Sequence, residues 1–242
     1  MKRVLLVLLP LFLCGAASFN GTQGAATFDN VVYNTNIITL SYWVRHDTTN
    51  NSKVVLETSS NAGSVNNSVY CATEGVPPNF QSFNIRGTAN NTYRSTTPIP
   101  LGVWIHTTAV FDKSTTYGDL TLYESGVLSS LSRPYASLTN SAGTANFASF
   151  TFRVGARGLS SAPMTGLIQD VAIYAGAVSA AEAFALGAQR MSPRKVRSAK
   201  LLYYWPFSAG ENPSNSPDLV GGIPVNRGTK SITTEQAPTI RK

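Results

Sequence analysis

Short β-rich segments, bounded by glycine, proline, asparagine or serine, recur through most of this chain. The clearest is Ile37–Arg45, where every second side chain is apolar and falls on one face of the strand: Ile38, Leu40, Tyr42 and Val44. Further segments of this kind follow at short intervals, and one stretch alone has the pattern of a helix. This spacing is typical of an all-β sandwich or barrel.

The stretch Gly166–Gln189 combines a strand, a short turn and that helix. The strand is largely apolar and carries a single acid, Asp170. Ser179 and Glu182 have the S-x-x-E spacing of a capping box, in which the serine hydroxyl accepts from the glutamate N–H and the carboxylate accepts from the serine N–H. The sequence therefore predicts an alanine-rich helix that begins after Ser179.

Charge is unevenly distributed along the 242 residues, whose net charge is +7. Residues 18–189 carry eight Lys/Arg and nine Asp/Glu (8 − 9 = −1), whereas residues 190–242 carry nine basic and three acidic residues (9 − 3 = +6). Lys2 and Arg3 supply the other +2. Folded domains that bind nucleic acid present a basic patch, so a near-neutral body predicts no nucleic-acid partner.

The N-terminus has the layout of a secretory signal peptide. Basic residues Lys2 and Arg3 precede the apolar stretch Val4–Leu13, and small residues follow up to Ala17. A membrane span needs about 20 apolar residues, so this stretch is too short for one. We expect residues 1–17 to be a leader, cleaved after Ala16 or Ala17, and the protein to be secreted, periplasmic or on the cell surface. The alternative is that the leader is retained and buried, as in a virion protein.

Six segments together resemble laminin G-like domains of the concanavalin A-like lectin/glucanase superfamily. Besides Gly166–Gln189, they are Phe19–Gly21 with Ala26–Asp29, Ile38–Arg45, Trp104–Asp112, Leu120–Val127 and Phe152–Ala156. The resemblance implies a two-sheet antiparallel jelly-roll sandwich over residues 17–189, with one short C-terminal helix. Beyond it we expect a basic linker at 190–200 and an extended Pro/Gly-rich tail at 201–242. The tail has one strand, which should pack on the sandwich or on a neighbouring copy.

Catalytic motifs are missing from the sequence. No E-x-D-x-x-E string supplies the carboxylate pair that a glycosidase needs, and no G-x-S-x-G elbow accompanies the two histidines, His46 and His106. We expect His106 in the core and His46 in a solvated loop. Cys71, the only cysteine outside the leader, is expected to be a small core residue. The sequence thus predicts a protein that is not an enzyme.

The predicted function is recognition of carbohydrate or of a surface protein. Candidate ligand-binding residues are Trp43, Arg45, Tyr70, Tyr93 and Arg94, because flat rings stack on sugar C–H faces and arginines donate hydrogen bonds. For Trp43, burial in a sandwich core is the alternative. We expect Tyr93 and Arg94 in a loop, Asn90–Arg94. Alternative functions are a structural virion or surface-assembly protein, which self-assembles through the basic tail, and, less favoured, a glycoside hydrolase.

Calcium is the one cofactor that the resemblance implies. Many laminin G-like domains hold a hard cation with carboxylate and carbonyl oxygens. Asp170 matches the acid of the closing strand, and Asn20 and Asp29 could join it if the first and last strands are neighbours. The alternative is that Asp170 accepts hydrogen bonds from backbone N–H groups in a tight corner.

Overall fold

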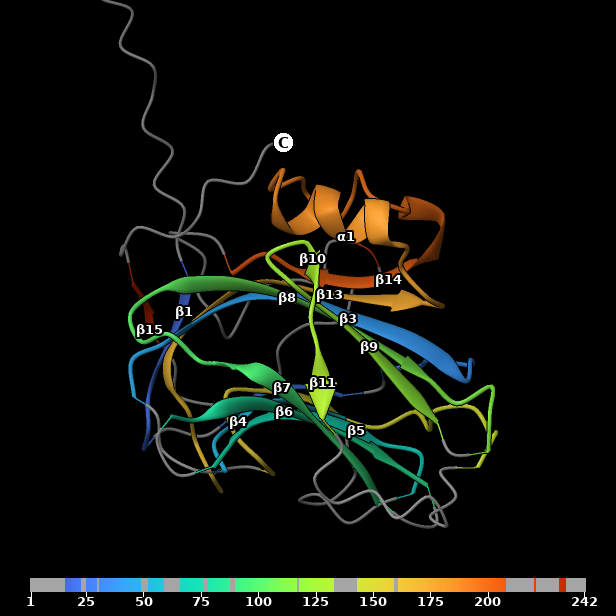
Figure 1. The fold of residues 1–242 in the computed structure, drawn as a ribbon, viewed down its shortest axis with the longest axis horizontal. Coiled ribbons are helices and arrows are strands. Elements are labelled where there is room, and N and C mark those ends of the chain that lie inside the picture. Colours follow the sequence, from blue (N-terminus) through green and yellow to red (C-terminus); the bar gives the residue numbers. More distant parts are fainter. Residues whose placement is uncertain are drawn as a thin grey trace, which may run out of the picture.

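The computed structural model describes residues 16–22, 25–29, 31–48, 52–58, 66–75, 78–87, 90–116, 118–132, 143–158, 161–207, 220 and 231–233. Two antiparallel sheets are stacked face to face, and the helix α1 (Ala180–Gly187) lies over the outer side of one of them (Figure 1). The predicted all-β, two-sheet jelly-roll sandwich with one short helix is therefore confirmed.

The eight-stranded sheet contains the strand order β10-β9-β8-β3-β13-β1-β15, and β14 also pairs with β13. Its strands are β1 (Ala16–Asn20), β3 (Ile37–His46), β8 (Trp104–Asp112), β9 (Asp119–Glu124), β10 (Val127–Leu128), β13 (Thr165–Ala175), β14 (Leu201–Trp205) and β15 (Ser231–Thr233). Strand β3 runs beside β13 on one side. On the other side, β1 covers the first part of β13 and β14 covers the second.

The seven-stranded sheet has the order β11-β7-β6-β5-β4-β12-β2. Its strands are β2 (Ala26–Phe28), β4 (Val54–Thr58), β5 (Val69–Glu74), β6 (Phe80–Arg86), β7 (Asn90–Pro98), β11 (Leu131–Ser132) and β12 (Phe152–Val154). The expectation that Asn90–Arg94 is a loop is wrong, since these residues begin β7. Polar residues obscure this strand, because Tyr93 is its only large apolar side chain.

The main core lies between the two sheets and includes the tail strand. Trp205 of β14 is fully buried, and its ring centroid lies 4.2 Å from that of Phe28 and 5.3 Å from that of Phe152. The sheet therefore continues past Gln189, the expected end of the sandwich. Cys71 is buried in this core as predicted, and burial raises the pKa of its thiol to about 12.

The two ends of the chain lie partly outside the described residues. The expected leader overlaps β1, because Ala16 and Ala17 are the first two residues of this strand. Both alanines are fully buried. Ala17 pairs with Ile168 of β13, so cleavage after either alanine would shorten β1. The rest of the leader and most of the tail from residue 208 onward are not described.

A second apolar cluster fills the space between α1 and the eight-stranded sheet. It joins residues of β8, β9, β13, β14, α1, the turn before α1 and the segment 190–200: Val110, Tyr123, Ala172, Tyr174, Val178, Ala183, Leu186, Val196, Leu201 and Tyr204. At the close contact between α1 and the β9–β10 turn, a Cβ on Gly187 would lie 2.4 Å from the backbone nitrogen of Gly126. Only glycine fits at this contact.

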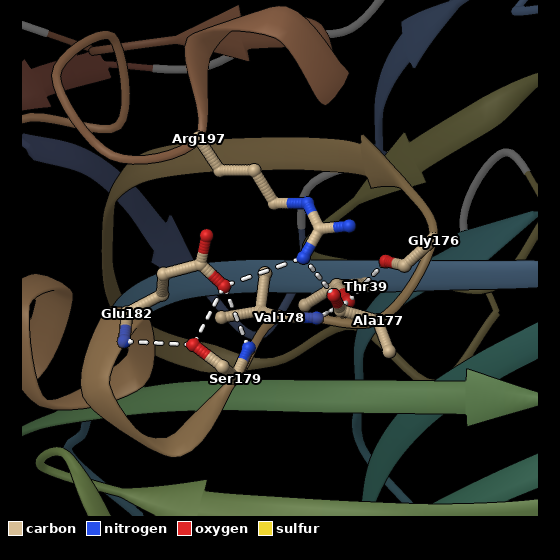
Figure 2. Close-up of polar contacts among 7 residues, drawn as sticks. All are labelled: Thr39, Gly176, Ala177, Val178, Ser179, Glu182 and Arg197. Carbon is tan, nitrogen blue, oxygen red and sulfur yellow. Dashed lines mark hydrogen bonds and ion pairs between the residues drawn. The ribbon is translucent and has the colours of Figure 1, made fainter.

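The predicted capping box is confirmed at the start of α1. The Glu182 N–H donates to Ser179 Oγ at 3.3 Å, and the Ser179 N–H donates to Glu182 Oε2 at 2.7 Å. Figure 2 shows Arg197 reaching the same carboxylate, with Nη1 3.3 Å from Glu182 Oε2, and the carbonyl of Ala177. Thr39 of β3 donates to the Gly176 carbonyl at 2.8 Å. The segment expected to be a linker is thus fixed to the sandwich at Arg197.

Candidate functional site

The outer face of the seven-stranded sheet carries a row of polar and aromatic side chains. Strand register aligns Arg153, Glu57, Tyr70, Asn84 and Thr92 across β12, β4, β5, β6 and β7. Residues aligned in this way share one face of a sheet. The neighbouring row points into the core instead and consists of Val154, Leu56, Cys71, Phe83 and Tyr93. The alternation of these two rows fixes which side chains face away from the core.

Glu57 is the buried centre of this row, with 1% of its surface exposed. The Gly158 N–H donates to Glu57 Oε2 at 2.9 Å. Two guanidinium groups flank the carboxylate at ion-pair distance: Arg153 Nη1 lies 3.9 Å from Oε2, and Arg157 Nε lies 3.9 Å from Oε1. Among the described residues, Oε1 has no hydrogen-bond donor.

Tyr70 is half-buried and has two arginines beside its ring. The Arg86 Cζ lies 6.0 Å and the Arg157 Cζ 5.8 Å from the ring centroid, within the range of a cation–π contact. Burial lowers the pKa of Arg86 and the charge of Arg157 adds to this effect, whereas Tyr70 and Glu57 oppose it. The two like charges thus lie beside the same ring.

A further arginine lies one row along on the same face. Arg94 of β7 is opposite Ser82 of β6, and its Cζ lies 5.0 Å from the ring centroid of Phe80. Ser82 is two residues from Asn84, about 7 Å along the strand. The outer face thus brings together aromatic rings, guanidinium groups and amide or hydroxyl groups. Tyr70, Arg86 and Arg94 are partly exposed, whereas Asn84 and Ser82 are buried.

Of the five residues predicted to bind ligand, the structure brings Tyr70 and Arg94 together on this face. Tyr93 points into the core, is 2% exposed and donates its hydroxyl to the Gly118 carbonyl at 2.6 Å. Trp43 lies on the outer face of the other sheet and is 4% exposed. Arg45, at the end of β3, forms an ion pair with Asp47 at 2.8 Å.

The surroundings of Trp43 are closed by other residues. The centroid of the Trp43 ring lies 5.0 Å from that of the His106 ring and 5.7 Å from the Cζ of Arg190. His106 is buried as predicted, with Nε2 3.0 Å from Ser41 Oγ, and burial lowers its pKa to about 3. His46 is also buried, so the expected solvated loop is wrong: it is the last residue of β3.

The three residues predicted to hold calcium lie apart in the structure. Asn20 is opposite Thr165, five residues before Asp170 on β13, a distance of about 17 Å along the strand. Asp29 follows β2 in the other sheet and accepts from Thr151 Oγ1 at 3.0 Å. Within the described part of the chain, no group of three or more His, Cys, Asp or Glu side chains could hold a metal ion.

Asp170 lies at a bulge of β13, between the part of this strand that pairs with β1 and the part that pairs with β14. Its φ is 51°, in the left-handed region, and its N–H donates to the Pro206 carbonyl at 3.2 Å. The Tyr204 hydroxyl donates to its carboxylate. Calcium binding stays a prediction, and a melting scan with calcium and with a chelator would test it.

A laminin G-type family profile, described as concanavalin A-like lectin/glucanases superfamily, matches residues 20–183. The chain belongs to this superfamily. The match runs from the end of β1 into α1, and the outer-face row lies entirely within it. No curated protein matches the chain.

Several solved structures share the fold at low sequence identity. A heptameric SAP-like pentraxin from Limulus polyphemus has 10% identity and a TM-score of 0.59, over 92% of this chain and 93% of that one. A proposed carbohydrate-binding protein from Bacteroides ovatus has 16% identity and a TM-score of 0.63, over 93% and 60%. The Ruminococcus gnavus IT-sialidase CBM40, bound to α2,3-sialyllactose, has 14% identity and a TM-score of 0.51, over 72% and 98%.

Sequence reasoning missed Glu57, Arg86, Arg153 and Arg157. The signal that would have found them is positional: Arg86 lies two residues from Asn84 on β6, and Glu57 lies between Arg153 and Tyr70 of the two neighbouring strands. Using that signal requires the strand order of the sheet, which brings β12 beside β4 although about 90 residues separate them in the sequence. No helix long and apolar enough to cross a membrane occurs among the described residues.

Proposed function

We propose that the chain is a non-catalytic module that binds carbohydrate on the outer face of its seven-stranded sheet. The observation that carries this proposal is the row Arg153–Glu57–Tyr70–Asn84–Thr92, which presents a half-buried ring between hydrogen-bonding groups. Sugars offer the matching chemistry, with C–H faces for a ring and hydroxyls for polar side chains. The fold shared with carbohydrate-binding domains supports the same choice.

The outer face of the other sheet is a weaker candidate for ligand binding. It is covered by α1 and by the segment that ends at Arg197, and Trp43 is buried beneath Arg190. Among the described residues, no helix lies over the seven-stranded sheet. Tyr70 itself is half-buried, so part of its side chain is accessible to a ligand.

The contacts of Glu57 favour binding over hydrolysis. A glycosidase uses two carboxyl groups about 5 to 10 Å apart, one of them protonated. Among the described residues, the partners of Glu57 are two arginines and a backbone N–H rather than a second carboxyl group. We therefore expect no release of reducing sugar when the full chain is incubated with a panel of polysaccharides.

A glycan array with the labelled full chain tests the proposal. The chain should bind at least one class of glycan, and Tyr70→Leu should weaken that binding about tenfold through loss of the ring. Phe184→Leu is the matched control, because Phe184 is an exposed ring on α1, over the other sheet. Binding that survives Tyr70→Leu but is lost in Phe184→Leu would overturn the site. A blank array would instead favour a surface protein or self-assembly as the partner.

The proposed place of action is outside the cell, at a surface or in the medium. The signal-peptide layout of residues 1–17 supports it. Mass spectrometry of the natural protein tests the proposal, since an intact Met1 would contradict export by cleavage of the leader.

A further inference from the structure

Positive charge accumulates on the proposed binding face. Four arginines lie there: Arg86, Arg94, Arg153 and Arg157. Among the described residues, the carboxylates on the same face are Glu57, which is buried, Glu74, at the end of β5 opposite Phe80, and Asp29, two residues beyond the Thr27 that pairs with Arg153. The excess among these residues is therefore 4 − 3 = +1, in a domain whose residues 18–189 sum to −1. The net charge of this face is thus positive, whereas that of the rest of the domain is negative.

The charges are concentrated around Tyr70. The Cζ atoms of Arg86 and Arg157 lie 6.0 and 5.8 Å from the centroid of its ring. The Glu57 carboxylate lies at ion-pair distance from two guanidinium groups, those of Arg153 and Arg157. Arg86, beside the same ring as Arg157, forms no ion pair among the described residues. An anion placed between Arg86 and Arg157 would relieve their mutual repulsion.

Buried polar atoms in the same cluster have no hydrogen-bond partner among the described residues. The acceptors are Glu57 Oε1 and Asn84 Oδ1, on side chains that are 1% and 2% exposed, and the donors are the Nε–H groups of Arg86 and Arg157. Native proteins leave few such atoms unsatisfied, and those that remain mark places where a ligand or water binds. The donors suit an anionic group, and the acceptors suit sugar hydroxyls.

We infer that the ligand of this face is an acidic glycan, whose carboxylate or sulfate group binds between Arg86 and Arg157. The inference rests on the proposed carbohydrate-binding function and adds the charge class of the ligand. Arginine is suited to this role because its planar guanidinium group makes paired hydrogen bonds to planar or tetrahedral anions. The ring of Tyr70 supports the sugar, and Asn84 and Glu57 accept from its hydroxyls.

Titration calorimetry with matched pairs of glycans tests the inference. The pairs are sialyllactose with its methyl ester, oligogalacturonate with its methyl ester, and a sulfated carrageenan oligosaccharide with its desulfated form. In at least one pair the acidic member should bind about tenfold more tightly or better. The preference should shrink between about 0.1 M and about 1 M salt, because salt screens exposed charges. The pairs that respond identify the anion as carboxylate or sulfate.

Single-arginine variants locate the anion. Arg86→Gln and Arg157→Gln should each lower affinity for the acidic glycan about tenfold and leave affinity for its neutral partner nearly unchanged. Arg190→Gln is the matched control, since it removes the same charge from the outer face of the other sheet. The Arg190→Gln variant should bind the acidic glycan with the same affinity as the unmodified chain.

Four results would overturn the inference. Equal binding of acidic and neutral members would refute it while leaving the proposed function intact, whereas binding of no glycan at all would refute the proposed function. An acidic preference that survives both arginine variants would refute the site. Equal binding of a single-stranded oligonucleotide would show charge attraction without selection for sugar. If a variant fails to fold, the matched pairs on the unmodified chain still decide.

Discussion

His46 and His106 are buried to the same extent, each with 2% of its surface exposed. Burial lowers the pKa of His46 to about 4 and that of His106 to about 3. In the unfolded chain both have the ordinary pKa of about 6.5. Below that pH the unfolded chain binds protons that the folded chain excludes, so the free energy of unfolding falls as pH falls. Above about pH 7 neither histidine contributes to the pH dependence.

Urea unfolding at a series of pH values checks this prediction. Between about pH 6 and pH 5 the free energy of unfolding should fall by up to about 1.4 kcal/mol per pH unit for each histidine. His106→Gln should remove about half of that slope, whatever its effect on stability at pH 7. A free energy that is constant from about pH 7 to pH 5 would contradict the burial of both rings.

The Glu57 carboxylate is buried, so its contribution to stability depends on the groups that pair with it. Glu57→Gln keeps an acceptor for the Gly158 N–H but removes the negative charge that faces Arg153 and Arg157. We expect the free energy of unfolding to fall by about 2 kcal/mol in urea titrations at neutral pH. Glu74→Gln, at the partly exposed end of β5, is the matched control and should change it by less than about 0.5 kcal/mol. Equal effects of the two would show that the Glu57 ion pairs contribute nothing particular.

The helix α1 depends on its cap and on the segment that follows it. Ser179 and Glu182 satisfy each other's backbone N–H groups, and Arg197 joins the same carboxylate (Figure 2). The two hydrogen bonds of the cap could be predicted from the S-x-x-E spacing alone, since they are local. The contact with Arg197 could not, because it depends on how residues 190–200 fold back over the sheet.

Removing the capping hydroxyl tests the importance of this element. Ser179→Ala should lower the free energy of unfolding by about 1 kcal/mol and speed amide exchange in the first turn of α1. Ser130→Ala, at an exposed serine after β10, should change neither quantity. Hydrogen exchange read residue by residue separates a local loss of the cap from a global one.

Sequence reasoning located strands well where apolar residues alternate and poorly where they do not. Ile37–Arg45 predicted β3 almost to the residue, whereas β7 was taken for a loop because its outward residues, Thr92 and Arg94, and most of its inward ones are polar. Tyr93 and Arg94 were both proposed as ligand contacts, and their opposite directions follow from β7 being a strand. Register, not residue type, therefore decides membership of the candidate site.

At the scale of the whole molecule, the C-terminal segment belongs to the sandwich. Strand β14 runs beside β13 in the eight-stranded sheet (Figure 1). Trp205 and Phe207 are fully buried in the core that also contains Phe28. The apolar run Leu201–Phe207 showed that this segment packs on something. Its place beside β13, next to β1, could not be derived from sequence, because that place depends on the order of strands far apart in the chain.

A chain that ends at Gln189 tests this assignment. Without β14 it loses Trp205 and Phe207 from the core and exposes an edge of β13. We expect no cooperative thermal transition above room temperature in circular dichroism, whereas a chain that ends at residue 234 should melt cooperatively. Equal melting temperatures for the two chains would show that the family domain folds without the tail strand.

The most direct test of carbohydrate binding on the seven-stranded sheet is NMR chemical-shift mapping with a glycan that the array selects. Backbone amides of Glu57, Tyr70 and Asn84 should shift as the glycan is added, while those of Ala183 and Leu186 in α1 should stay in place. Shifts confined to α1 and residues 190–200, or shifts absent from β4, β5 and β6 at saturating glycan, would contradict the site.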